Sequence, residues 1–166
     1  MNLRTITTTT VVLTALSSAL AAQNDVVLLK EGGRLRGVTV TAATATDVSY
    51  TQGSDEKKVA AAKVRDITWG DAPEAFALAQ SLEEGGKFEE AATQFLEAAS
   101  NAKRPVVKED ATFRGARAAI AGAGNDAAMA QGAAGRLQEY LDAAPQGFRV
   151  GHDRSVPVPE QHVESR

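Results

Sequence analysis

Polar and apolar residues alternate along the chain between residues 25 and 70. Within residues 35–40 and 47–51, β-branched or aromatic residues recur at alternate positions, and glycine-rich turns separate the apolar runs. A period of two is typical of strands that bury one face, because successive side chains point to opposite sides of a sheet. The pattern predicts strands over 26–29, 35–40, 47–51 and 65–69, a further strand that begins at Lys58, and one helical turn over 60–63.

Five short strands at this spacing favour a closed or nearly closed small barrel over an open sheet, whose edge strands would be exposed. The order of the elements resembles that of the SH3-like and Sm-like small barrels, and residues 30–37 carry the likeness. The resemblance implies a five-stranded β-barrel over residues 25–70. The loop residues with which Sm-like rings bind RNA are not identifiable here, so RNA binding is not expected. The predicted barrel core is Val27, Leu29, Leu35, Val38, Val40, Val48, Tyr50, Val59, Ile67 and Trp69.

The apolar period changes from two to 3.6 after residues 70–73, which end in a proline suited to the first turn of a helix. Small residues at the helix contact, an aromatic residue after a Gly-Gly turn and an A-x3-F-x2-A run resemble one tetratricopeptide repeat over residues 72–105. A helical hairpin of no particular family is the alternative. The residues that carry this likeness are Leu78, Ala79, Leu82, Gly86, Phe88, Ala91, Phe95 and Ala98.

A second pair of helices is predicted over residues 108–144, with a glycine turn at 122–125. It matches the repeat less well, because its second helix is too long and no aromatic residue follows its turn. The predicted fold class is therefore α+β: a small five-stranded SH3-like β-barrel, then a TPR-like α-helical hairpin array of about four helices over residues 72–145. Solenoids need about three repeats or a cap. Either the barrel caps one end, the protein self-associates, or the chain is a shortened form of a longer array, which is the favoured alternative.

The two ends of the chain differ from its middle. Arg4, the apolar residues from Ile6 to Leu20 and an A-x-A site at 19–21 are typical of a cleavable signal peptide over residues 1–21. Threonines interrupt the apolar run, so we expect cleavage, with membrane contact only through the removed segment, and a periplasmic or extracellular location. Residues 146–166 show no periodicity and are predicted to form a disordered tail.

Composition narrows the chemistry. The 166 residues include 18 basic and 21 acidic side chains, a net charge of −3, and no cysteine. Disulfides and thiolate sites are therefore excluded, and the lack of a basic surplus argues against a nucleic-acid partner. A G-x-G-x-x-A run at 122–127 follows a predicted helix rather than a strand, so no dinucleotide cofactor is expected. His152 and His162 lie in the predicted tail, so we expect no metal site and no catalytic residue.

The remaining candidate site follows from the repeat resemblance. In tetratricopeptide arrays the first helix of each pair lines the concave groove, which implies a partner-binding groove formed by Phe76, Gln80, Glu83, Arg114 and Arg117. The arginines would clamp a carboxylate of the partner. The alternative is that they form salt bridges with Glu83, Glu97 or Glu109.

The function predicted from these observations is that of a non-enzymatic exported protein-interaction module, which resembles exported bacterial proteins and binds a protein or peptide partner of unknown identity. The alternative is a structural, self-associating component of a cell-envelope assembly. An enzyme is the third reading, and it would require a convergent polar pocket.

Overall fold

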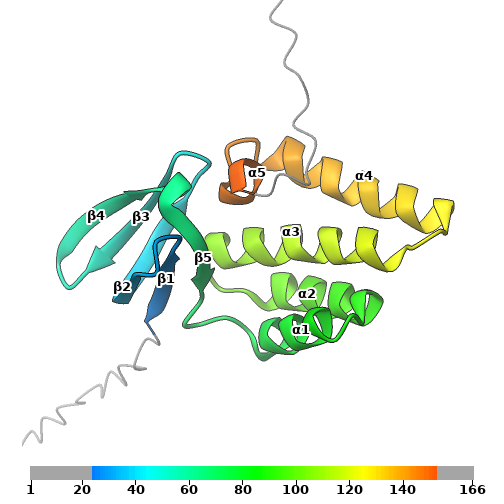
Figure 1. Cartoon of the computed structure of the whole chain (residues 1–166), viewed down its shortest axis with the longest axis horizontal. Coiled ribbons are helices and arrows are strands. Elements are labelled where there is room, and N and C mark those ends of the chain that lie inside the picture. The colour runs from blue at the N-terminus through cyan, green and yellow to red at the C-terminus, as the bar shows by residue number, and fades with distance from the viewer. Residues whose placement is uncertain (1–23, 153–166) are drawn as a thin grey trace, which may run out of the picture.

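The computed structural model describes residues 24–152. The predicted signal peptide, residues 1–21, lies outside the described residues. Within the described range the protein is α+β, with a five-stranded antiparallel sheet followed by four long helices and one short one, as Figure 1 shows. The predicted fold class is confirmed at this level.

The sheet contains five strands in the order β4-β3-β2-β1-β5, and each pairs antiparallel with its neighbours. A 3₁₀ turn over Ala61–Lys63 leads into the last strand, where one helical turn was predicted. The strands β4 and β5 occupy the two edges of the sheet. The ladder does not close, so the barrel stays a prediction. The bounds are Asp25–Leu29 (β1), Arg34–Ala43 (β2), Asp47–Gln52 (β3), Asp55–Ala60 (β4) and Val64–Thr68 (β5).

The helices follow as two antiparallel hairpins and a short terminal helix. In Figure 1, α1, α2, α3 and α4 are stacked in chain order beside the sheet. Gly86 has φ +74°, which glycine adopts without strain, and it lets the chain reverse between the first two helices. Asp126 caps α4, because its carboxylate accepts hydrogen bonds from two amides of the first turn. The bounds are Glu74–Glu84 (α1), Phe88–Asn101 (α2), Pro105–Gly122 (α3), Ala127–Ala143 (α4) and Phe148–His152 (α5).

One hydrophobic core joins the sheet to the helices. Seven of the ten predicted sheet-core residues are buried, and the other three, Leu29, Leu35 and Val59, are half-buried against the same core. That cluster continues without a break into Phe95 of α2 and Phe148 of α5. The two predicted parts of the chain are therefore packed together along one shared core.

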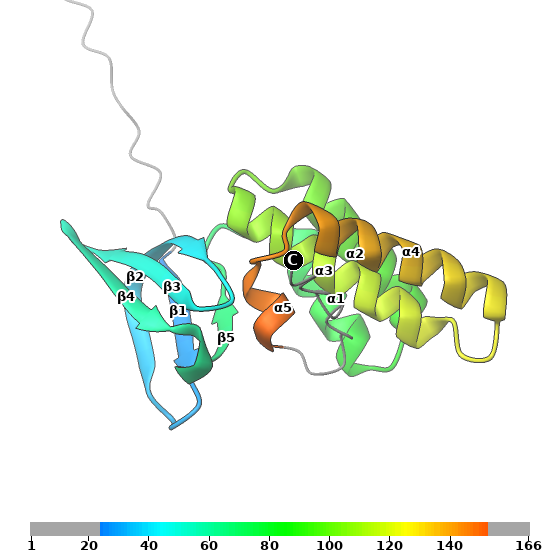
Figure 2. The same ribbon diagram turned by 90° about the horizontal axis from the view of Figure 1, so that it is seen from above.

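The segment after the fourth helix corrects the prediction of a disordered tail. Gly147 forms a β-bridge with Thr44, the Gln146 carbonyl accepts a hydrogen bond from the Ala45 amide at 2.8 Å, and α5 follows at once. Figures 1 and 2 both place α5 between the sheet and the helices. The prediction was wrong for residues 146–152, because burial of Phe148 fixes a segment that is too short to show a period. Residues 153–166 lie outside the described range.

No helix among residues 24–152 combines the length and the apolar character that a membrane crossing requires.

Candidate functional site

The five residues of the predicted groove lie near one another, but they do not form an open surface. Phe76 is only 3% exposed and packs edge-to-face on Phe95, with ring centroids 5.4 Å apart. Leu78, which the repeat pattern places at the helix contact, is instead 50% exposed. The buried face of α1 is therefore rotated toward Phe76, whose larger ring fills the space against α2. Gln80 is half-buried on the same helix.

The two arginines of the predicted groove are engaged within the protein. Arg117 pairs with Glu83 at 2.6 Å, as the salt-bridge alternative predicted. Arg114 is 6% exposed, lies 5.5 Å from the ring centroid of Phe76 and pairs at 2.8 Å with Asp66 of β5. These contacts correct the prediction of a partner-binding groove, because a side chain that balances a buried charge is not displayed to a partner.

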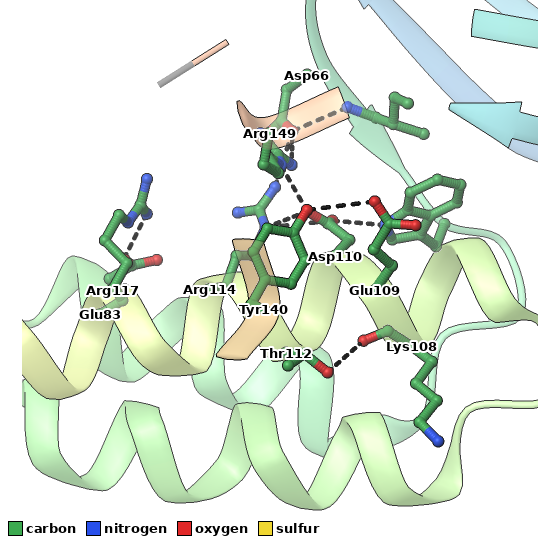
Figure 3. A network of polar contacts seen from close by, with 12 residues as sticks. Asp66, Glu83, Lys108, Glu109, Asp110, Thr112, Arg114, Arg117, Tyr140 and Arg149 are labelled. Atoms are coloured by element: carbon green, nitrogen blue, oxygen red, sulfur yellow. Dashed lines mark hydrogen bonds and ion pairs between the residues drawn. The ribbon is translucent and has the colours of Figure 1, made fainter. Parts of the chain in front are cut away.

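Arg114 belongs to a charged junction, by which we mean Asp66, Asp110, Arg114 and Arg149. Asp110 accepts a hydrogen bond from Arg149 Nε at 2.5 Å and one from the indole Nε1 of Trp69 at 2.7 Å. Arg149 also pairs with Asp66 at 2.7 Å. Figure 3 shows both arginines converging on the Asp110 carboxylate. The junction therefore ties β5 to α3 and α5 through charges that are mutually balanced.

The electrostatics of the charged junction follow from burial and pairing. Burial by itself disfavours the ionised form of Asp110, but the guanidiniums of Arg149 and Arg114 more than offset that cost and lower the pKa of this carboxyl. The pKa of Asp66 is lowered for the same reasons. The pKa of Arg149 is raised by the two carboxylates, despite the opposing effect of burial. Asp66, Asp110 and Arg149 therefore carry their charges at neutral pH.

Arg104 makes a second link between the sheet and the helices. Its guanidinium pairs with Asp25 of β1 at 2.8 Å, with Asp71, and with the Val40 carbonyl at 3.0 Å. It also lies 5.6 Å from the ring centroid of Trp69. Asp25 in turn accepts hydrogen bonds from backbone amides of β2 and of the segment after β5. These groups satisfy one another's hydrogen bonds and hold the helices against the sheet. They do not line an open surface, which lies between α3 and α4.

That open surface is an apolar groove of about 600 Å³, which we call the α3–α4 groove. Leu96 of α2 lines one side, and stripes of residues at helical spacing on α3 and α4 line the rest. A second hollow of about 320 Å³ adjoins it and shares Leu96 and Arg136. The two stripes are Pro105, Lys108, Glu109, Thr112 and Ala116 on α3, and Arg136, Glu139, Tyr140 and Ala143 on α4, which Ala144 follows at the C-cap.

The groove also contains a tyrosine–glutamate pair. The Tyr140 hydroxyl donates to Glu109 Oε1 at 3.2 Å, and the Tyr140 ring packs on Phe113. Burial raises the pKa of Glu109, although the hydrogen bond from Tyr140 works in the opposite direction. Burial and the neighbouring Glu109 raise the pKa of the Tyr140 phenol, so the phenol remains a hydrogen-bond donor. The arrangement offers an apolar bed with few polar groups, as in a recognition site.

The sequence contained a signal for this groove that the repeat pattern did not use. Thr112, Ala116, Ala143 and Ala144 are small residues that line the groove on α3 and at the end of α4, and short side chains on two packed helices leave space between them. The charged junction had no such signal, because Asp66, Asp110 and Arg149 are far apart in the sequence.

Comparison of the chain with family models, with curated proteins and with solved structures gives no match. Among residues 24–152, no group of three or more histidine, cysteine or acidic side chains is arranged to hold a metal ion.

Proposed function

We propose that this chain is a non-enzymatic, exported protein-interaction module that uses the α3–α4 groove as its docking surface. The observation that carries the proposal is the groove itself, which is apolar, about 600 Å³ in volume and bounded by α2, α3 and α4. Helices α2 and α3 belong to the core shared with the sheet, and α4 packs on α3 through a second buried cluster. Grooves between helices commonly receive an apolar face of a partner helix.

The frame supports this use of the groove. The shared core, the ion pairs of Arg104 and the charged junction hold α2 and α3 against the sheet, and a second buried cluster holds α4 on α3. These contacts support a groove that is formed before any partner arrives. A preformed site loses less conformational entropy on binding than one that must be ordered by its ligand.

We also propose that the sheet is an SH3-like barrel and that the helices are a short tetratricopeptide-type array. The strand order and the 3₁₀ turn before β5 support the first assignment, and the glycine turn with the buried Ala91, Phe95 and Ala98 supports the second. Export rests on the signal-peptide pattern of residues 1–21 alone.

Site-specific photo-crosslinking in cells tests the function. A photoreactive residue at Thr112, in the groove, should capture a distinct exported protein, whereas the same residue at the exposed Ser81 of α1 should not. Ala143→Arg on the groove wall should abolish the adduct, and Ala134→Arg, exposed on α4 outside the groove, should leave it unchanged. Adducts with copies of the same chain alone would favour the structural, self-associating alternative.

A further inference from the structure

Two cations on the walls of the groove differ from the arginines of the frame. Lys108 on α3 and Arg136 on α4 are both exposed, and neither forms an ion pair with another residue of the described range 24–152. By contrast, Arg104, Arg114 and Arg149 are each paired with a carboxylate. Lys108 and Arg136 therefore present two positive charges that no carboxylate of the described residues pairs with, although Glu139 and, in the adjoining hollow, Glu89 are exposed beside them.

Helix geometry sets the spacing of these cations. The contact between Phe113 and Tyr140 brings those two residues to the same level of the antiparallel pair α3 and α4. Lys108 comes five residues before Phe113, and Arg136 comes four residues before Tyr140. Because the helices run in opposite directions, these offsets add to about 13 Å along the groove at 1.5 Å per residue.

The length of the groove indicates the shape of its occupant. The two adjoining hollows are lined along α4 from Met129 to Ala143, which corresponds to about 21 Å. That is the length of about four helical turns. An amphipathic helix laid in a groove anchors through apolar residues at i, i+3, i+4 and i+7, which matches an elongated apolar bed.

The acidic residues of the groove leave the two cations available. Glu109 accepts the hydrogen bond from Tyr140, so its carboxylate is engaged by the phenol. Glu139 lies between the levels of Lys108 and Arg136 and is exposed. A partner residue that faces Glu139 is therefore expected to be neutral or basic, while those that face the two cations are expected to be acidic.

We propose that the α3–α4 groove binds an amphipathic helix of an exported protein that carries two acidic residues on opposite flanks of its apolar stripe, one for Lys108 and one for Arg136. A separation of about 13 Å corresponds to roughly nine positions along a helix, and residues nine positions apart point about 180° away from each other. The acids therefore meet the two opposite walls of the groove. This inference rests on the proposed function.

Synthetic helical peptides test the inference against the whole chain. The first peptide carries a leucine stripe with i, i+3, i+4 and i+7 spacing and two glutamates roughly nine positions apart on its flanks. The second is identical except that lysines replace the two glutamates. Titration by fluorescence anisotropy should show the glutamate peptide binding roughly tenfold or more tightly than the lysine peptide, and this preference should weaken as salt is added.

A charge-reversal variant, Lys108→Glu with Arg136→Glu, should invert that preference. The matched control, Arg34→Glu with Lys58→Glu, changes the net charge equally at exposed positions of the sheet and should leave the preference unchanged. Equal affinities for both peptides would overturn the inference, as would no binding of either one. Tighter binding of oleate than of either peptide, measured by competition, would also overturn it, because the occupant would then be a lipid.

Failure of this inference can be distinguished from failure of the proposed function. If photo-crosslinks at Thr112 capture an exported protein but the peptides show no charge preference, the interaction role stands and the pairing with Lys108 and Arg136 is wrong. If neither experiment shows groove-dependent binding, both proposals fail.

Discussion

Among single residues, Asp110 is the one on which the buried charges of the charged junction most depend. It is 4% exposed, and its carboxylate is shared between Trp69 and two arginines that are themselves buried. Asp110→Ala should lower the free energy of unfolding by about 3–5 kcal/mol, because it leaves the guanidiniums of Arg114 and Arg149 partly uncompensated. Urea unfolding followed by circular dichroism measures the loss.

The control for that substitution is Glu97→Ala on the exposed face of α2. It should change stability by no more than about 0.5 kcal/mol, as is usual for surface positions. Equal effects of the two substitutions would show that the charged junction contributes nothing specific to stability.

The same residues predict how stability depends on pH. The pKa values of Asp66 and Asp110 are lower in the folded protein than in the unfolded chain. Their ionised forms therefore contribute stability above the unfolded-state pKa, about 3.9 for aspartate, and that contribution is lost as the pH falls through this value toward the folded-state pKa values. Unfolding free energies measured from pH 7 to pH 2 should drop below about pH 4.

Comparison with Asp110→Asn isolates the contribution of Asp110 to this acid dependence. Other carboxylates titrate in both proteins, so only the difference between the two curves belongs to Asp110. The variant should be less stable at pH 7 and should lose less stability than the parent below about pH 4. Parallel curves over the whole range would contradict the lowered pKa of Asp110.

At the scale of elements, the short segment between α4 and α5 depends on a close approach. A Cβ atom at Gly147 would lie 2.7 Å from the Tyr140 hydroxyl oxygen and 3.1 Å from the Ala144 carbonyl oxygen. Gly147→Ala should therefore force α5 away from its place and lower stability by about 1–3 kcal/mol. Thermal unfolding provides the measurement.

A second glycine gives the opposite expectation and serves as the control. Gly135 is exposed within α4, and a Cβ atom there would meet open space. Gly135→Ala should raise stability by about 0.5–1 kcal/mol, because alanine loses less conformational freedom in a helix than glycine does. If both substitutions stabilise the protein, α5 is not held against Tyr140 as described.

The elements also show which structural features sequence patterns can predict. The alternation that includes Val38, Val40, Val48 and Tyr50 predicted strands that the structure contains. It could do so because the buried residues of a strand recur at every second position within that strand's own sequence. Helix α5 was missed, since five residues are too few to display a period and its position is fixed by contacts with distant elements.

The candidate site was less predictable than the fold for a related reason. The salt-bridge alternative for Arg117 agrees with its pair to Glu83, but whether a residue lines a surface or fills the core depends on side-chain size at the contact. Phe76, and not Leu78, lies on the buried face of α1. The charged junction depends on residues 83 positions apart, from Asp66 to Arg149, and no local pattern relates them.

At the scale of the whole molecule, the sheet and the helices share one core. The ion pairs of Arg104 and the charged junction also link them, so neither layer is expected to stay folded without the other. Val27 of β1, Phe95 of α2 and Phe148 of α5 belong to the same buried cluster. Separating the layers would expose that apolar surface and would also break the ion pairs of Arg104 and Arg149.

Unfolding should therefore be a single cooperative transition. Trp69 is the only tryptophan, and it contacts Arg104 as well as Asp110 of the charged junction, so its fluorescence reports on the contact between sheet and helices. Far-ultraviolet circular dichroism at 222 nm reports mainly on the helices. The two probes should give coincident urea curves, and in Asp110→Ala both midpoints should fall together. A fluorescence transition that precedes the loss of helix would show that the sheet detaches first and that the helical layer, with its groove, is stable without it.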